Sequence, residues 1–376
     1  MSWPVIVASG GPRERGRAYG EAAATRIDRS LALYAEVFER YAALGWAEVR
    51  DRAGGFVEHL EAYDVELLPE IEGIAEGAGV DAEDVLTLNL RTEIMFGLGA
   101  RSGQGASECT AAAVSTATGP IVAQNWDWKP AVRDTCVLLA CAPARRPGFV
   151  TVVEAGLLAK FGLNERGLAL ATNALTSSRD RGEPGVPYHA ILRRILTSGT
   201  FEEAVAAVRD AARASSANYL IGSADGRLID LETTPGGADG VHATEGAPLV
   251  HANHFTWPSP RAFKDVGRVD GEDSVRRHAI METALMPGAA PGIGPRIAEI
   301  QAALRNHDGH PSSICAHEDD TVDPIEDYVT AAAFVAEPSA GRAWITEGPP
   351  CERLFEPVDV ATLLASARTT SAAAAP

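Results

Sequence analysis

Apolar side chains recur at helical spacing through the first quarter of the chain. Over residues 19–41 they return every three or four positions, which predicts one long helix after a short opening strand at Val5–Val7. The same spacing predicts further helices over 47–63 and from Leu68 onward. We therefore expect residues 1–98 to be mostly helical.

Beyond Cys109 the pattern changes to short runs of β-branched and apolar residues that are separated by turn residues. The first two runs predict a hairpin that ends at Trp128 and turns at 118–120. Turn signals at 164–167 and 224–226 likewise favour antiparallel hairpins over long βαβ crossovers. Helical spacing returns at 188–197, 201–213, 273–285 and 296–305.

No internal repeat and no linker divide the chain into autonomous parts. Its 376 residues, 46% of them apolar, are enough to bury a sizeable core. We therefore predict a single α+β domain over 1–376. The low-complexity segment 367–376 is expected to form a disordered tail.

Charge and cysteine content narrow the classes of function. There are 33 basic and 51 acidic residues, a net charge of −18, which disfavours nucleic acid and anionic membranes because both require a basic surface. No run of about twenty apolar residues could span a bilayer, and the first residues lack the basic and apolar regions of a secretory signal. Five cysteines without a CxxC pair fit reduced thiols, so we expect a cytoplasmic protein.

The first candidate for chemistry is a cysteine at a junction between a loop and a strand. A Gly/Ser-rich segment runs directly into Cys109, which opens the predicted hairpin. A lone cysteine is usually a small buried hydrophobe, the reading that suits Cys136 and Cys141. A thiol at the end of such a loop is instead placed to react, so we predict that Cys109 is a nucleophile.

Several further stretches occur in the order that is typical of one enzyme family. They are EIEGIAEGAG, ECTAAAV, AQNWDW, FGLNERGLALATNAL, SSANYLIGSADG, LVHANHF and SICAH, and they cover most of residues 68–330. In these motifs the chain resembles the acyl-CoA:6-aminopenicillanic acid (isopenicillin N) acyltransferase-like family, within the N-terminal nucleophile hydrolase superfamily.

The resemblance implies a fold and a mode of maturation. The fold is a four-layer αββα sandwich, in which two antiparallel sheets lie between helical layers. The resemblance implies that the chain would be made as an inactive precursor that cuts itself between Glu108 and Cys109. The products would be an α fragment, 1–108, and a β fragment, 109–376, which would remain associated. Glu108 departs from the relatives, which carry Gly before the nucleophile.

The chemistry of the cut explains why the precursor would be inactive. A thiol attacks as its thiolate, so it needs a base. The α-amino group that the cut releases on Cys109 has an unperturbed pKa of about 7.7–8.0, which suits proton transfer near neutral pH. Before the cut that nitrogen is an amide and cannot accept the proton.

The resemblance also assigns roles to polar residues at matching positions. Asp127 of NWDW would orient the new amine. Asn173 and Asn253 match family asparagines near the catalytic centre, where each amide donor can stabilise an oxyanion by about 3–4 kcal/mol. We further expect contacts to the substrate from Trp126, Thr110, His254 and Arg277. Arg277 is a candidate for binding a carboxylate or phosphate.

A concentration of imidazoles and thiols invites a zinc interpretation. His251 and His254 lie in a strand-like run, where a separation of three puts them on opposite faces. The second set is His307, His310, Cys315 and His317, which lies in a predicted loop and lacks a second paired set. We therefore predict no metal site, and no cofactor.

The sequence favours an enzyme that forms an acyl-enzyme on Cys109 from a linear amide or a thioester. Water or an amine acceptor then receives the acyl group, and the sequence does not decide between them. Two alternatives stay open: a papain-like Cys-His hydrolase, although the CGSCW-type signature is absent, and a binding protein that kept the fold without processing. Homo-oligomer formation also stays open.

Overall fold

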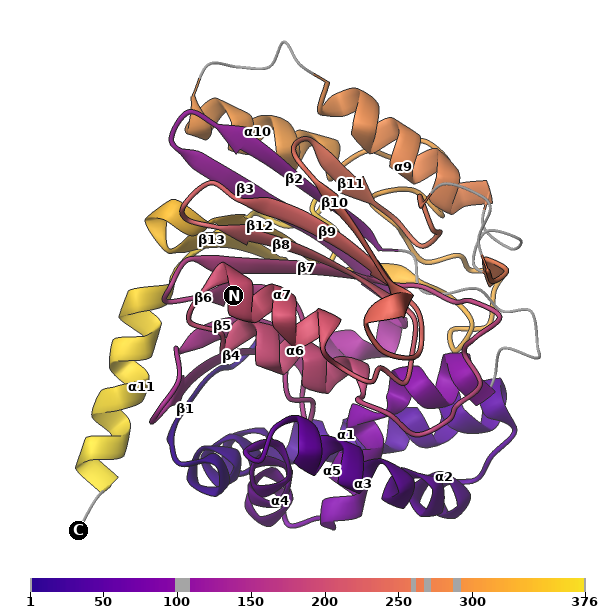
Figure 1. Ribbon diagram of the computed structural model, residues 1–376, viewed down its shortest axis with the longest axis vertical. Coiled ribbons are helices and arrows are strands. Elements are labelled where there is room, and N and C mark those ends of the chain that lie inside the picture. Colours follow the sequence, from indigo (N-terminus) through magenta and orange to yellow (C-terminus); the bar gives the residue numbers. More distant parts are fainter. Residues whose placement is uncertain (1, 99–108, 258–261, 267–271, 287–291, 375–376) are drawn as a thin grey trace.

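The structure is a computed structural model that describes residues 2–98, 109–257, 262–266, 272–286 and 292–374. Two β-sheets lie face to face, and helices cover the outer face of each sheet (Figure 1). The predicted four-layer αββα sandwich is confirmed. Most of the apolar core fills the space between the sheets and under the N-terminal helices.

The larger sheet has eight strands in the spatial order β1-β4-β5-β6-β7-β8-β9-β10. They are β1 (Val5–Gly10), β4 (Cys136–Pro143), β5 (Phe149–Glu154), β6 (Gly162–Asn164), β7 (Leu168–Ala174), β8 (Ala217–Ser223), β9 (Leu228–Thr233) and β10 (Val241–Glu245). Neighbours are antiparallel except β1 and β4, which run parallel. A parallel pair needs a long crossover, and here the N-terminal helices and the first hairpin supply it.

The smaller sheet has six antiparallel strands in the order β11-β2-β3-β12-β13-β14. They are β11 (Leu249–His251), β2 (Thr110–Thr116), β3 (Gly119–Trp128), β12 (Val329–Glu337), β13 (Arg342–Glu347) and β14 (Glu356–Asp359). The predicted hairpin is confirmed as β2 and β3, paired from Thr110 opposite Asn125 to Thr116 opposite Gly119. Its turn lies at 117–118, because Gly119 and Pro120, which were expected in the turn, already belong to β3.

Helices cover each sheet from outside. The larger sheet is covered by the N-terminal helices and by α6, α7 and α11, and the smaller sheet by α9 and α10 (Figure 1). Their bounds are α1 (Pro12–Ala42), α2 (Trp46–Ala53), α3 (Val57–Tyr63), α4 (Leu67–Ala78), α5 (Ala82–Asn89), α6 (Tyr188–Leu196), α7 (Phe201–Arg209), α9 (Glu272–Ala284), α10 (Ile293–Ala303) and α11 (Val360–Ala374).

The predicted helices are found with two differences. The helix expected over 47–63 is interrupted by a 3-10 turn at Gly54–Phe56, because two successive glycines weaken the helical backbone. The segment 367–376 was expected to be a disordered tail, but α11 continues to Ala374. Leu364 and Ala367 of α11 are buried, so packing stabilises a helix that composition alone does not specify.

α1 and α4 pack almost backbone to backbone. Each carries two glycines four residues apart, Gly16 and Gly20 in α1 and Gly73 and Gly77 in α4. A Cβ atom at Gly20 or at Gly77 would lie 2.1 Å from a backbone oxygen of the opposite helix. Only glycine permits this approach, which sets α4 directly against the helix that covers β1.

A buried carboxylate joins three helices of this layer. Glu70 of α4 accepts hydrogen bonds from Arg15 of α1 at 2.6 Å and from Arg193 of α6 at 2.8 Å. Burial raises the pKa of Glu70, but the two guanidinium groups outweigh it and hold that pKa below its usual range. The N-terminal helices are thereby tied to residues far along the chain.

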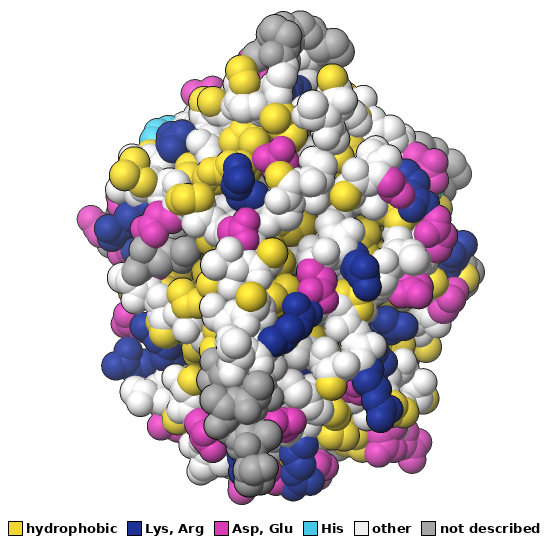
Figure 2. Space-filling model, turned by 90° about the vertical axis from the view of Figure 1, so that its left-hand side faces the viewer, with side chains coloured by type: hydrophobic (Ala, Val, Ile, Leu, Met, Phe, Trp, Pro, Cys, Tyr) yellow, Lys and Arg dark blue, Asp and Glu magenta, His cyan; other side chains and the backbone are white. Residues whose placement is uncertain are grey.

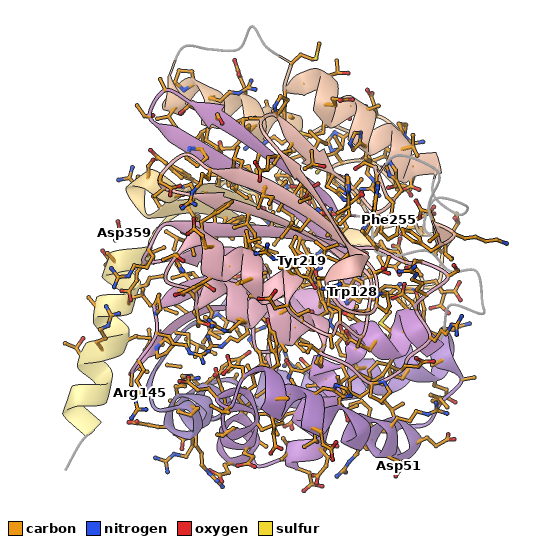
Figure 3. All side chains as sticks on the ribbon, in the orientation of Figure 1. Asp51, Trp128, Arg145, Tyr219, Phe255 and Asp359 are labelled. Atoms are coloured by element: carbon orange, nitrogen blue, oxygen red, sulfur yellow. The ribbon has the colours of Figure 1, made fainter. Side chains whose placement is uncertain are left out.

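The surface and the interior have the composition expected of a globular chain. Basic and acidic side chains are interspersed over the face shown in Figure 2. Side chains fill the interior, where Trp128 and Tyr219 are buried (Figure 3). None of the helices in the described ranges is both long and apolar enough to cross a membrane.

Candidate active site

Cys109 lies immediately before β2 and is buried, with 2% of its surface exposed. Asn125 of β3 points to the outer face of the sheet, because it donates to backbone oxygens at the end of α10 and in the loop after it. Thr110 of β2 is paired directly with Asn125 and therefore lies on the same outer face. Successive side chains alternate between faces. The thiol of Cys109 accordingly faces inward, between the sheets.

On that inner side the thiol lines a small cavity. The cavity is lined by Cys109, Arg91, Thr92, Phe96, Trp128, Lys160, Thr172, Ala174 and Tyr188. Its volume of about 10 Å³ is close to what one water molecule occupies. The walls come from the helical layer, from both sheets and from the loop before β6, so the site assembles only when these layers are in place.

The backbone of Cys109 is held by two buried side chains. Its nitrogen donates to Oδ1 of Asn253 at 2.8 Å, and its carbonyl oxygen accepts from Nη1 of Arg277 at 2.7 Å. The same Nη1 donates to Oγ1 of Thr110 at 3.0 Å. The nucleophile candidate is thus fixed at both backbone atoms while its sulfur faces the cavity.

The orientation of the Asn253 amide follows from its neighbours. Oδ1 receives two donors, the nitrogen of Cys109 and Nη2 of Arg277 at 3.1 Å. Nδ2 donates to the carbonyl oxygen of Ala174 at 3.0 Å. Asn253 therefore presents its oxygen to the nitrogen of Cys109, which is the atom that would become the α-amine.

Arg277 was expected to contact an acidic substrate group. In the structure it is buried in α9, and its two Nη atoms contact Cys109, Thr110, Asn253 and Asp273. This arrangement makes Arg277 a residue that positions the start of β2. Thr110 was also expected to contact the substrate. In the structure its hydroxyl lies on the outer face, where it accepts a hydrogen bond from Arg277.

Asp127 lies on the outer face of β3, two residues beyond Asn125. Its Oδ1 accepts a hydrogen bond of 2.6 Å from Oγ1 of Thr330 on β12, and the side chain is fully buried. The carboxylate and the thiol of Cys109 are therefore on opposite faces of the sheet. Asp127 is therefore not placed to act on the sulfur of Cys109, and its predicted role concerns the backbone nitrogen of that residue instead.

The other predicted residues lie around the same end of the sandwich. Asn173 of β7 is buried, accepts from Asn218 at 3.4 Å and donates to the carbonyl oxygen of His251 at 3.5 Å. Trp126 is buried on the inner face. His254 is held by Oγ of Ser274 at 2.8 Å. Glu108, the residue before the predicted cut, lies outside the described residues.

Lys160 is a residue of the cavity that sequence reasoning missed. Its ammonium nitrogen lies 4.1 Å from the ring centroid of Trp126, and it is buried in the same cavity as Cys109. Burial, followed by the nearby Arg91 guanidinium, lowers the pKa of Lys160 to about 7. Its signal in the sequence is a single lysine within the apolar stretch GLLAKFGL.

A buried ion pair forms the wall behind Lys160. Arg91 donates to Glu154 at 2.9 Å, and Tyr34 also donates to this carboxylate. Nε1 of Trp128 donates to the Tyr34 hydroxyl at 2.9 Å. These hydrogen bonds hold Arg91 and Trp128, which line the cavity, in fixed positions. The cavity therefore has little room to change shape on this side.

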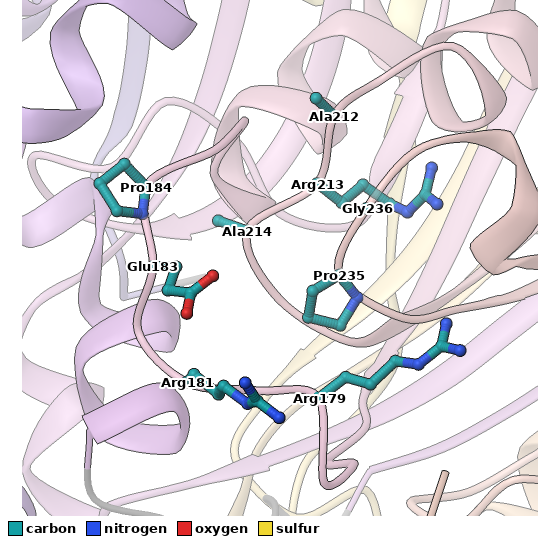
Figure 4. A pocket seen from close by; sticks show the side chains of 9 residues that line it. All are labelled: Arg179, Arg181, Glu183, Pro184, Ala212, Arg213, Ala214, Pro235 and Gly236. Carbon is teal, nitrogen blue, oxygen red and sulfur yellow. The ribbon is translucent and has the colours of Figure 1, made fainter. Parts of the chain in front are cut away.

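A larger hollow of about 390 Å³ lies beyond the ends of β7, β8 and β9 (Figure 4). The loop that bears Arg179, Arg181 and Glu183 forms one side of it, and segments with Arg213 and Pro235 form the other. Four backbone carbonyl oxygens hold Arg213 in place. The loop itself runs between two residues of the Cys109 cavity, from β7 to the start of α6.

The solved structures that match this chain include two of low identity. A penicillin V acylase from Agrobacterium tumefaciens matches with a TM-score of 0.37 and 15% identity, over 64% of this chain and 82% of that one. A mutant of conjugated bile acid hydrolase from Clostridium perfringens matches with a TM-score of 0.41 and 12% identity, over 68% of this chain and 94% of that one.

Sequence comparison gives a closer relationship. The 40 kDa form of acyl-coenzyme A:6-aminopenicillanic-acid-acyltransferase from Emericella nidulans is 28% identical over 312 residues, 82% of this chain and 84% of the relative. The family model for acyl-coenzyme A:6-aminopenicillanic acid acyl-transferase matches residues 114–351, which are more than half of the chain and begin five residues after Cys109. The chain therefore belongs to the acyl-coenzyme A:6-aminopenicillanic acid acyl-transferase family.

Proposed function

We propose that this chain is a self-processing acyltransferase or amidohydrolase whose nucleophile is the N-terminal cysteine of its β fragment. The observation that carries the proposal is the environment of Cys109: its sulfur faces a small cavity, while Asn253 and Arg277 hold its nitrogen and carbonyl oxygen. Catalysis by an N-terminal residue needs such a nitrogen, fixed beside its own nucleophilic atom.

Processing begins on the bond between Glu108 and Cys109. The sulfur attacks the Glu108 carbonyl carbon, the C–N bond breaks, and the nitrogen of Cys109 takes a proton and becomes an amine. Water then hydrolyses the thioester, which leaves a carboxylate on Glu108 and a free thiol on Cys109. Asn253 already accepts a hydrogen bond from the nitrogen that is released, so the amine forms in a position that is fixed beforehand.

Turnover uses the same sulfur with the new amine as its base. The amine accepts the thiol proton, the sulfur attacks the carbonyl carbon of a linear amide or thioester, and the leaving group departs with a proton from the ammonium. Water or an amine then takes the acyl group from the sulfur. The relative is named for an acyl-coenzyme A, which is a thioester, so thioesters are the first donors to examine.

Contacts across the proposed cut support lasting association of the two fragments. β1 belongs to the α fragment, yet it forms the edge of the larger sheet by pairing along β4 of the β fragment. The ion cluster of Arg15, Glu70 and Arg193 also spans both fragments. Separation would expose a strand edge and leave buried charges without partners, each at a large free-energy cost.

Intact-mass analysis of the purified wild-type chain tests the proposal. We expect two species that sum to the precursor plus one water, with the larger one beginning at Cys109. A screen of thioesters, p-nitroanilides and amino-acid amides, with and without amine acceptors, then separates transfer from hydrolysis. A chain that stays whole and active would refute the N-terminal nucleophile. A whole and inert chain would favour a binding protein of the same fold.

Lys160 gives a prediction about the first step, in which the α-amine does not yet exist. With its pKa lowered to about 7, chiefly by burial, the amine of Lys160 becomes neutral above that pH and can accept the Cys109 proton. We expect Lys160→Met and Lys160→Arg to process at least about tenfold more slowly, since base catalysis contributes about 10²–10⁴-fold. Processing time courses by mass spectrometry measure this.

The pH dependence of processing has a definite sign. Lys160 must be neutral to act, so the wild-type rate should rise as the pH increases through about 7. Neither variant should keep that rise. Full-rate processing by Lys160→Arg would show that a permanent positive charge suffices and would exclude the role of base, since arginine does not deprotonate in proteins.

A further inference from the structure

Two imidazoles and two thiols converge at a place that the proposed catalysis does not use. His307 follows α10, Cys315 and His317 lie in the loop before β12, and Cys351 follows β13. One ligand atom from each, a ring nitrogen or a sulfur, lies within 4.8 Å of all the others. Two segments, the loop between α10 and β12 and the turn after β13, therefore bring these atoms to one point.

The spacing of the atoms matches a tetrahedral ion. Zinc bonds of about 2.3 Å to sulfur and about 2.0–2.1 Å to nitrogen put tetrahedral ligand atoms roughly 3.3–3.8 Å apart. The two sulfurs are 3.5 Å apart, and the Nε2 atoms of His307 and His317 are 3.1 Å apart. Nε2 of His317 lies 3.7 Å from the sulfur of Cys315 and 3.3 Å from that of Cys351.

We propose that His307, Cys315, His317 and Cys351 bind a structural zinc ion. Two thiolates and two neutral imidazoles form a common ligand set for this ion, and four protein ligands leave no position for a substrate or a catalytic water. Both thiols lose their protons on binding, so the site with its ion is neutral. This proposal is independent of the proposed acyl transfer.

A carboxylate lies behind one of the ligands. Nδ1 of His317 is 3.4 Å from Oε1 of Glu352, while Nε2 of the same ring faces the cluster. An imidazole that binds a metal through one nitrogen usually directs the other to a carboxylate or a carbonyl oxygen. Glu352 follows Cys351 directly in the chain. One short turn after β13 therefore supplies both the ligand Cys351 and the carboxylate that orients His317.

The sequence predicted no metal site because it offered no second pair of ligands near Cys315 and His317. Cys351 completes the set from thirty-six positions beyond Cys315. The antiparallel pairing of β12 and β13 folds the chain back on itself and returns Cys351 to the level of the loop before β12. No spacing rule for short motifs covers ligands that a sheet brings together in this way.

The site would fasten a long loop to the smaller sheet. Cys315 is followed by Ala316, whose nitrogen donates to Thr330 at 2.9 Å, and Thr330 donates in turn to Asp127. The loop between α10 and β12 also packs Ile314 into the apolar cluster with α9 and α10. The ion would therefore fix the segment that supports Thr330, on the face of β3 where Asp127 lies.

Metal analysis of the full-length wild-type protein, purified under reducing conditions with added zinc, tests the site. We expect about one zinc per chain, and Cys351→Ser and His317→Gln should lose it to a chelator at least about a hundredfold faster. His310→Ala and Cys109→Ala are matched controls, an adjacent imidazole and the proposed nucleophile, and both should keep the ion. Because Cys351 is exposed and His317 is only partly buried, both variants should remain folded.

Cobalt replacement gives a readout that does not depend on variants. Co²⁺ in the wild-type site should show intense tetrahedral bands together with thiolate-to-metal charge transfer. Wild-type protein without stoichiometric zinc would overturn the proposal, as would a cobalt spectrum without thiolate bands or retention of zinc by Cys351→Ser. A Cys315–Cys351 disulfide that persists in protein purified under reducing conditions with added zinc, seen as a loss of two hydrogens, would overturn it as well.

Discussion

Cys109→Ala is expected to remain a single chain of 376 residues and to show no turnover. The substitution removes the atom that attacks Glu108 in processing and the acyl donor in catalysis. Loss of a nucleophile costs on the order of 10⁶-fold where it has been measured in hydrolases, so at least about 10³-fold is expected here. Intact mass and steady-state rates with the preferred acyl donor measure the two effects.

The fold should survive this change. Alanine is smaller than cysteine, so the substitution only enlarges a cavity of about 10 Å³ by the volume of one sulfur atom. We expect this to lower the free energy of unfolding by on the order of 1 kcal/mol. Cys141→Ala is a suitable control, a buried thiol on β4 that should leave processing intact. Cys109→Ser keeps a weaker nucleophile and should process slowly. Measurable turnover by a folded Cys109→Ala protein would disprove the assignment.

Asn253→Ala is expected to lower kcat/KM by about 10²–10³-fold, the second largest effect. Its Oδ1 accepts from the nitrogen of Cys109, so its loss leaves the future amine without its fixed partner. Family resemblance assigned Asn253 to the oxyanion through its amide N–H. In the structure Nδ2 donates to Ala174 instead, which favours a role as the acceptor for the amine.

Asn253→Asp separates these two roles. It keeps an acceptor oxygen and removes the N–H donor, so it should retain more activity than Asn253→Ala if the oxygen matters. A carboxylate beside the amine also favours the ammonium form, which raises the pKa of the amine. The acidic limb of the kcat/KM profile should therefore move to higher pH, because the amine acts as a base only when it is neutral. Equal losses in both variants with an unmoved profile would support the oxyanion role.

The two proposed sites lie on opposite sides of one sheet. Cys109 faces the space between the sheets, whereas Cys315 lies beyond the outer face, where Asp127 contacts Thr330. On the same outer side, Arg277 of α9 donates to Thr110 and so holds the start of β2. The proposed reaction thus lies on one face of the sheet and the proposed zinc ion on the other. We therefore expect zinc removal to lower the stability of the fold more than it lowers the turnover rate.

Local pattern was enough for most of the helices, for the first hairpin and for the family. Helical periodicity placed α1, α6, α7, α9 and α10, and turn residues placed the hairpin of β2 and β3, because both depend on neighbours within a few positions. The candidate nucleophile was found in the same way, as a cysteine at the junction where that hairpin starts. The family resemblance then supplied the αββα arrangement.

What the sequence by itself determined was therefore most of the helices, the first hairpin, the family and the candidate thiol. Only the tertiary structure decided the parallel pairing of β1 with β4, the approach of Lys160 to Cys109 and the arrival of Cys351 beside Cys315. It also decided that Asn253 turns its oxygen, and not its nitrogen, toward Cys109. Each of these depends on groups that are distant in the chain and meet only when the layers pack, so no local pattern specifies them.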